Sequence, residues 1–228
     1  MSIQVIAMHG WAGDSRGWQP FAAAARRRGW RWQSVDRGYG RCEPVLVRWL
    51  PEDGLRVLVA HSLGPHLLDA DVLTRADALV LLASFGRFLP PGREGRRLGA
   101  ALAAMGQSLR GPEPEAMLRA FLAEAAAPRP LSELPVTIAD DPLPLAGRQR
   151  LLDDLTLLAH CQGLPAALPA AAPCLIVEAG ADRIVAPHAR TLLRQERAGA
   201  TLIHYPQAGH CLLGTSVLPD LLAWIGNL

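Results

Sequence analysis

The sequence predicts an α/β fold: a mostly parallel, doubly wound sheet of about six strands with an inserted helical cap. Short runs rich in Val, Ile and Leu alternate with longer segments rich in Ala, Leu and Arg, which is typical of parallel strands joined by crossover helices. The alternation stops between residues 84 and 168, where prolines separate several helical pieces and no convincing strand occurs. The length of 228 residues suits one domain with a full core.

The apolar runs place the strands on the sequence, and the segments between them place the helices. The expected strands are Ile3–Met8, Trp30–Val35, Arg56–Ala60, Ala78–Ala83, Cys174–Ala179 and Thr201–Tyr205. The expected helices outside the cap are Trp18–Arg28, Pro44–Leu50, Gly64–Leu73, His188–Arg197 and Val217–Gly226. We therefore expect residues 1–84 and 169–228 to form the sheet domain and residues 85–168 to form the helical cap.

The charge of the chain argues against a nucleic-acid-binding protein. The formal net charge is only +2, and all 23 basic residues are arginines. Binding to phosphates requires many positive charges gathered on one face.

No apolar stretch reaches the roughly 20 residues that span a bilayer, and no secretion signal is evident before the first strand. We expect a cytoplasmic monomer that binds neither nucleic acid nor membranes.

The four cysteines predict neither a metal site nor disulfides. Cys42, Cys161, Cys174 and Cys211 are scattered without the spacing of metal ligands, and the histidines add no metal set. A chain of this size with its own core does not need disulfides. The cysteines are therefore expected to be thiols of the cytosol, and no metal or cofactor is expected.

An apolar strand that runs directly into a serine marks a candidate nucleophile. Residues 57–64 are Val-Leu-Val-Ala-His-Ser-Leu-Gly, and a helical pattern follows. This is the pattern of a nucleophile elbow, a turn so tight that the residues two before and two after the serine must be small. Ala60 and Gly64 meet that requirement around Ser62, although Ala60 replaces the usual glycine. The alternative is a serine that only caps the following helix.

A serine nucleophile needs a base within hydrogen-bond reach and a carboxylate that orients the base. The loop after Cys174–Ala179 brings Asp182 to the carboxyl edge of the sheet, where open α/β sheets bind ligands. After the last strand, Gly209 allows the loop to turn so that His210 reaches back toward Ser62. The order of the three residues predicts a catalytic triad. Taken separately, the aspartate could be a loop cap and the histidine a surface residue.

The loop after the first strand predicts an oxyanion hole. An oxyanion is stabilised by two backbone N–H donors, one from the residue after the nucleophile and one from this loop. We expect Leu63 and Trp11 to supply them, because Gly10 permits the backbone to turn its amide toward the substrate. Trp11 is also expected to wall an acyl pocket, a core tryptophan being the alternative, and His9 is expected to brace the loop.

The segments HGWAG, AHSLG, GADRIV and AGH together resemble the α/β-hydrolase superfamily over nearly the whole chain. Within it, the opening HGWAGDSRGWQPF, the turn Ser62-Leu63-Gly64 and the segment Leu157–Pro169 look like the pimeloyl-[acyl-carrier-protein] methyl ester esterases of biotin synthesis. This resemblance implies a serine carboxylesterase that cleaves a methyl ester of a carrier-bound dicarboxylic acyl chain. Members of that family commonly begin with a β-hairpin, whereas this sequence starts almost directly at Ile3, so trimmed sheet edges are expected.

The resemblance also implies a partner, because the cap of those esterases carries arginines that meet the acidic carrier protein. The corresponding candidates here are Arg93, Arg96, Arg97, Arg110 and Arg119. Residues 85–110 hold five arginines against the single Glu94. Such an imbalance steers acidic partners toward the surface that carries it. The alternative is a solvated, arginine-rich helix.

Two other functions remain open. Short-acyl carboxylesterases and triad-bearing hydrolases or lyases of C–C bonds share the same catalytic residues, and only the cap distinguishes them. A ligand receptor could also keep the fold without the chemistry, because a fold alone does not guarantee a reaction. The complete set of triad residues favours an enzyme.

Overall fold

The computed structural model of the chain describes residues 2–51, 54–135 and 137–228, and in it all strands join one sheet. The order is β2-β1-β3-β4-β5-β6, and every neighbouring pair is parallel. The strands are β1 (Ile3–Met8), β2 (Arg31–Ser34), β3 (Leu55–His61), β4 (Ala78–Leu82), β5 (Cys174–Ala179) and β6 (Thr201–Tyr205). The predicted six-stranded parallel sheet is confirmed, and the predicted strands match within one residue at each end.

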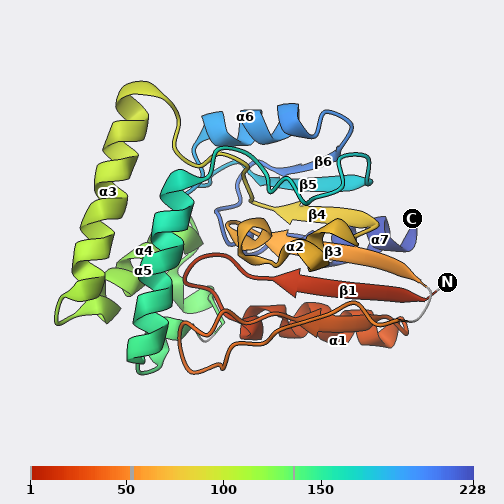
Figure 1. Cartoon of the computed structure of the whole chain (residues 1–228), viewed down its shortest axis with the longest axis horizontal. Coiled ribbons are helices and arrows are strands. Elements are labelled where there is room, and N and C mark those ends of the chain that lie inside the picture. Colours follow the sequence, from red (N-terminus) through yellow and green to blue (C-terminus); the bar gives the residue numbers. More distant parts are fainter. Residues whose placement is uncertain (1, 52–53, 136) are drawn as a thin grey trace.

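Helices cover both faces of this sheet (Figure 1). Alternate residues of the central strands point to opposite faces, so Val57 and Val59 pack with α1 (Gln19–Arg27) and α7 (Val217–Gly226). Leu58, which lies between them, points to the other face and packs there in one cluster with α2 (Ala70–Thr74) and α6 (Pro187–Glu196). Strands β1, β4 and β5 are buried along their whole length, which explains their nearly continuous apolar sequences.

Two predicted helices are wrong. Residues 44–50 are irregular and not helical: the N–H of Val45 donates to the carbonyl of Asp36, and the Leu50 N–H donates to the side chain of Gln4. Tertiary hydrogen bonds therefore satisfy this backbone in place of helical ones. The predicted helix Gly64–Leu73 is split into a 3₁₀ turn, Gly64–Leu67, and α2, because Leu68 is extended. This break lets adjacent leucines 67 and 68 pack on the same cluster.

The segment between β4 and β5 forms the layer over the carboxyl ends of the strands (Figure 1). In the described part of residues 85–168 it contributes no strand to the sheet. Its helices are α3 (Gly92–Arg110), α4 (Pro114–Ala126) and α5 (Leu145–His160), with short 3₁₀ turns at Leu131–Glu133 and Ile138–Asp140. We call this segment the cap. Its core, which includes Leu118 and Leu151, is continuous with Trp11 and Leu63 from the sheet domain.

Among the described helices, none combines the length and the apolar character that crossing a bilayer requires.

A buried carboxylate attaches the cap to the sheet domain. Asp154 of α5 is 2% exposed and accepts two hydrogen bonds from the Arg37 guanidinium, at 2.6 and 2.8 Å, and one from the Tyr39 hydroxyl at 2.7 Å. Burial and the adjacent carboxylate raise the pKa of Tyr39 well above its usual value, so the phenol keeps its proton. Arg37 in turn donates its backbone N–H to His9 Nε2 at 3.1 Å. The cap helix α5 is thereby connected to the loop after β1.

Replacing Asp154 by Ala would leave the buried Tyr39 hydroxyl without its acceptor and would remove the partner of the partly exposed Arg37 guanidinium. We expect the free energy of unfolding to fall by about 1–3 kcal/mol, which is the usual effect of leaving a buried donor unpaired. Asp153→Ala is the matched control, because Asp153 is the preceding residue of the same helix and is exposed; it should change stability by less than about 0.5 kcal/mol. Urea unfolding of both variants measures this, and equal losses would contradict the prediction.

Candidate active site

Ser62 occupies a strained turn at the end of β3. Its φ is +55°, in the left-handed region that costs a non-glycine residue about 1–3 kcal/mol. Two hydrogen bonds hold it there: its N–H donates to the Leu82 carbonyl at 2.9 Å, and the Ser84 hydroxyl donates to its carbonyl at 2.6 Å. The predicted elbow geometry is therefore present.

The small residues around the turn are required by close approach of the backbone. A Cβ on Gly64 would lie 2.7 Å from the Met8 carbonyl oxygen and 3.3 Å from the Ala60 Cβ. The first distance excludes any side chain at residue 64. The second distance shows that the Ala60 side chain faces Gly64. Because Gly64 has no side chain, there is room for alanine at residue 60.

The predicted triad side chains come together over the carboxyl edge of the sheet. His210 Nε2 lies 3.0 Å from Ser62 Oγ, and His210 Nδ1 lies 2.8 Å from Asp182 Oδ2. The serine and the histidine are 5% and 2% exposed, so the hydrogen-bond chain is shielded from water. Nδ1–H donates to the carboxylate, which leaves Nε2 free to accept the serine proton.

The carboxylate is held in its charged form. Its second oxygen, Asp182 Oδ1, accepts the backbone N–H groups of Ile184 and Val185 at 2.7 and 2.9 Å. Burial opposes ionisation, but His210 and these two N–H groups outweigh it and lower the pKa of Asp182. An ionised carboxylate is the form that orients the imidazole and stabilises its protonated state.

Gly209 is needed for a reason other than the one expected from the sequence. Its φ is not positive in the structure, so it is not required for an unusual turn. Instead, a Cβ at this position would lie 1.7 Å from the carbonyl oxygen of Ala127, at the end of α4. The loop that carries His210 thus presses its backbone against the cap.

His61 is a neighbour of the triad whose contact the sequence did not reveal. Its Nε2–H donates to the backbone carbonyl of His210 at 3.0 Å, and the two imidazole rings lie 4.8 Å apart. Burial, followed by the proximity of His210, lowers the pKa of His61 to about 3. The ring therefore stays neutral at physiological pH and adds no positive charge beside the triad.

The loop after β1 lies directly against the serine. A Cβ on Gly10 would be 2.7 Å from Ser62 Cβ and 3.2 Å from Ser62 Oγ. Within the described residues, the backbone N–H groups of Trp11 and Leu63 donate to no other protein group, as two donors kept for a substrate oxygen would require. His9 Nδ1–H donates to the Gly10 carbonyl at 2.8 Å, which is the bracing contact expected for this histidine.

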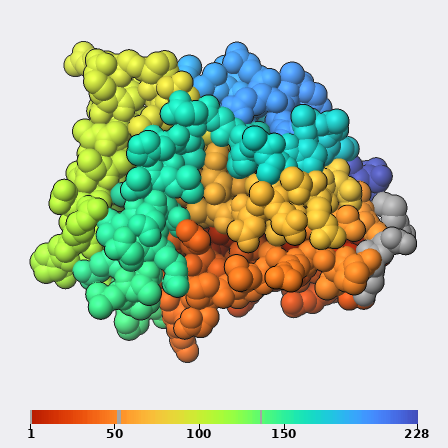
Figure 2. Space-filling model, in the orientation of Figure 1, coloured from red at the N-terminus to blue at the C-terminus, as the bar shows by residue number. Residues whose placement is uncertain are grey.

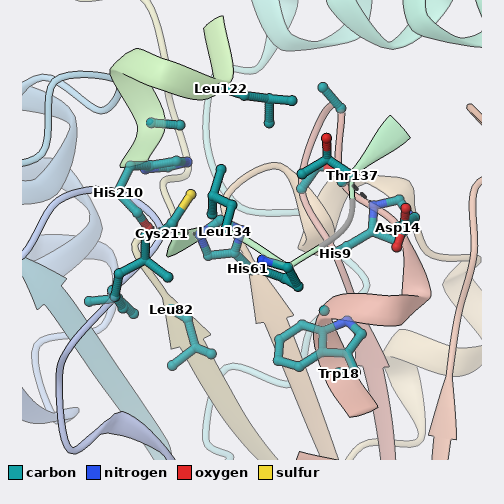
Figure 3. Close-up of a pocket in the computed structure, with 18 of the residues that line it drawn as sticks. His9, Asp14, Trp18, His61, Leu82, Leu122, Leu134, Thr137, His210 and Cys211 are labelled. Carbon is teal, nitrogen blue, oxygen red and sulfur yellow. Dashed lines mark hydrogen bonds between the residues drawn. The ribbon is translucent and has the colours of Figure 1, made fainter. Parts of the chain in front are cut away.

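A cavity of about 550 Å³ opens beside the triad (Figure 3). His210, His61 and Gly10 border it at the sheet edge, and Phe121 and Leu122 of α4 border it from the cap. Trp11 lines it as predicted, with its ring edge against Phe121 and its Nε1–H donating to the Leu151 carbonyl at 2.9 Å. The lining is mostly apolar, which suits an aliphatic chain.

The cap arginines lie away from this cavity, on the outside of the cap. All five candidates, Arg93, Arg96, Arg97, Arg110 and Arg119, are exposed and none lines the cavity. The first four lie on α3, which forms one end of the molecule in the space-filling view (Figure 2). Arg119 lies on α4 and donates to the Ala139 carbonyl. Their role toward a partner remains a prediction.

One group of potential metal ligands comes together in the described residues. Asp14, Asp36 and Cys42 offer ligand atoms within 4.8 Å of one another. Both carboxylates are already used: Asp14 accepts from the side chain of Arg16, and Asp36 accepts the N–H groups of Ser15 and Gly38. The two carboxylates therefore serve as hydrogen-bond acceptors that hold the loops at residues 14–16 and 36–38.

Comparison with known proteins places these features in a family. Residues 5–216 match the model of the "Alpha/beta hydrolase family". The fold is similar to an esterase from Exiguobacterium antarcticum (TM-score 0.74, 16% identity, 99% of this chain and 92% of that chain). It is also similar to a thermophilic esterase from Thermogutta terrifontis (0.69, 16%, 100% and 90%) and a bromoperoxidase from Bacillus anthracis (0.67, 16%, 99% and 92%). No curated protein matches the sequence.

These structural likenesses, at such low identity, concern the fold alone, whereas the family match spans most of the chain. The chain belongs to the alpha/beta hydrolase family.

Proposed function

We propose that the protein is a serine carboxylesterase and that its substrate is a methyl ester of a dicarboxylic acyl chain bound to an acyl carrier protein. The observation that carries the first part is the unbroken hydrogen-bond chain from Asp182 through His210 to Ser62 beside an apolar cavity. A hydroxyl is a weak nucleophile at neutral pH, and this arrangement activates it.

The reaction follows from the positions of these groups. Ser62 Oγ attacks the ester carbonyl while His210 Nε2 accepts its proton, and the Trp11 and Leu63 N–H groups stabilise the oxyanion. His210 then donates that proton to the departing alcohol as the C–O bond breaks, which leaves an acyl-enzyme. Water attacks the acyl-enzyme, again losing a proton to His210, and the acid leaves as Ser62 recovers its hydrogen.

Two features support the carrier-bound substrate. The cavity is apolar enough to take a methylene chain, and the exposed arginines of α3 offer a positive surface to an acidic carrier. The sequence segments described above resemble esterases that act on such a substrate. A small-molecule ester is the alternative substrate. The fold also resembles that of a bromoperoxidase, and one fold can host more than one chemistry.

Removing the nucleophile tests the mechanism. Ser62→Ala should lower kcat on a 4-nitrophenyl ester on the order of 10⁶-fold and abolish labelling by a fluorophosphonate, because the triad acts as a unit. Ser108→Ala, at an exposed serine of α3, should keep both activity and label. Undiminished hydrolysis by Ser62→Ala would exclude the mechanism, and an unlabelled wild-type protein would favour a receptor.

Filling the space at Gly10 tests the oxyanion loop. A methyl group at residue 10 would meet Ser62 Cβ at 2.7 Å, so Gly10→Ala must push the loop away from the nucleophile. We expect kcat to fall about 10²- to 10³-fold, which is the usual effect of losing an oxyanion donor. Gly199→Ala, where nothing lies within 4 Å of the added Cβ, is the control. Steady-state kinetics with equal loss in both variants would refute the assignment.

Charge reversal on α3 tests the carrier. Arg96→Glu combined with Arg97→Glu should reduce kcat/KM at least about tenfold for pimeloyl-carrier methyl ester at low salt, because steering by surface charges is lost. Activity on a 4-nitrophenyl ester should not change. Arg26→Glu with Arg27→Glu, an exposed pair on α1, is the control. An unchanged rate with the carrier-bound ester would show that the α3 surface does not dock a carrier.

A further inference from the structure

The backbone carbonyl of His210 has one hydrogen-bond donor within the described residues, and this donor is a side chain. His61 Nε2–H lies 3.0 Å from the carbonyl oxygen, and no backbone N–H of the described residues donates to it. His210 is 2% exposed, so water has little access to this residue. Because a buried carbonyl without a donor is unfavourable, the His61 bond holds the backbone from which the His210 imidazole projects.

The residue after His210 is attached to a different part of the molecule. The N–H of Cys211 donates to the carbonyl of Ala125 in the cap helix α4 at 3.1 Å. That contact fixes the loop relative to the cap. His61, in contrast, directly precedes Ser62 in the sequence. The His61 bond therefore joins the loop of the base to the turn of the nucleophile.

Together with the triad, this bond closes a ring of contacts. The ring leads from Ser62 Oγ to His210 Nε2 at 3.0 Å, then along His210 to its carbonyl, and on to His61 Nε2. The peptide bond between His61 and Ser62 completes it. A closed ring restricts the separation of nucleophile and base more than two side chains on independent loops would be restricted. Such fixed placement of reacting groups lowers the barrier of a reaction.

The neutral form of His61 suits this arrangement. Burial, followed by the proximity of His210, lowers the pKa of His61 to about 3, so the ring carries a single proton near neutral pH. The bond to the carbonyl requires that proton on Nε2. The two rings lie 4.8 Å apart, and both line the cavity (Figure 3). A neutral donor holds the base without repelling the positive charge that the base acquires.

We propose that His61 is a positioning residue whose Nε2–H holds the backbone of His210, so that the His210 imidazole stays within hydrogen-bond reach of Ser62. His61 accepts no proton from the substrate or the nucleophile and acts through His210. The proposal rests on the proposed esterase function and adds a residue to its machinery. Removing the donor should therefore lower kcat and leave substrate binding nearly unchanged.

Two amide variants test the donor. The side-chain nitrogen of Gln can occupy the place of imidazole Nε2, whereas the shorter Asn reaches only the place of Nδ1. His61→Asn should lower kcat on a 4-nitrophenyl ester about 10- to 100-fold with little change in KM, because a base displaced by about 1 Å has such an effect. His61→Gln should restore most of the activity. Equal losses in both variants, no loss in His61→Asn, or a loss confined to KM would overturn the proposal.

His61→Phe keeps an aromatic ring and lacks the donor. It should lose as much activity as His61→Asn, and it replaces that variant in the comparison with His61→Gln should the asparagine variant not fold. Full activity of His61→Phe would overturn the proposal.

His66→Asn is the matched control. His66 makes the same kind of contact elsewhere: its Nε2–H donates to the Phe85 carbonyl at 3.0 Å, and its ring is partly buried like that of His61. It is not among the residues that line the cavity. Urea unfolding should show similar losses of stability in His66→Asn and His61→Asn, whereas kcat should fall only in His61→Asn. An equal fall of kcat in both would assign the effect to lost stability and overturn the proposal.

Labelling by a fluorophosphonate separates this proposal from the esterase function, because the reagent reacts with an activated serine whatever the natural substrate is. The rate constant of labelling at Ser62 should fall in His61→Asn and recover in His61→Gln. If this order is found in a protein that cleaves no ester, only the esterase is refuted. If ester cleavage and labelling are both unchanged in His61→Asn, only the role of His61 is refuted.

Discussion

The active-site geometry depends on the close approach of two backbone segments, the loop after β1 and the turn at Ser62. Gly10 lies against the serine side chain, and Gly64 lies against the carbonyls of Met8 and His9. At these distances no side chain fits between the segments. The strained φ of Ser62 is tolerated because hydrogen bonds to Leu82 and Ser84 fix the turn from the other side.

The cap is attached to the same loop. Trp11 donates to the backbone of α5, and His9 is joined through Arg37 to Asp154 of the same helix. The cap thus contributes to the position of the proposed oxyanion donors as well as to the wall of the cavity. On the opposite side, the backbone of Gly209 packs against the end of α4, so the cap also fixes the loop that carries His210.

The electrostatics of the site combine one stabilised charge with neutral rings. Two backbone N–H groups and His210 keep Asp182 ionised. Burial lowers the pKa of His9 and of His61, so these two rings stay neutral and act through fixed hydrogen bonds to backbone carbonyls. In the proposed reaction, a positive charge on His210 would therefore be stabilised by the Asp182 carboxylate and not opposed by its histidine neighbours.

The strands and the triad could be read from the sequence because each depends on a short local pattern. Apolar runs such as Cys174–Ala179 fix the strands, and parallel strands bring Asp182 and His210 to the edge where Ser62 lies. Residues 44–50 were misassigned as a helix because their backbone partners, Asp36 and Gln4, come from other elements. The role of Asp154 and the reason for Gly209 likewise arise from contacts between residues distant in sequence, which no local pattern encodes.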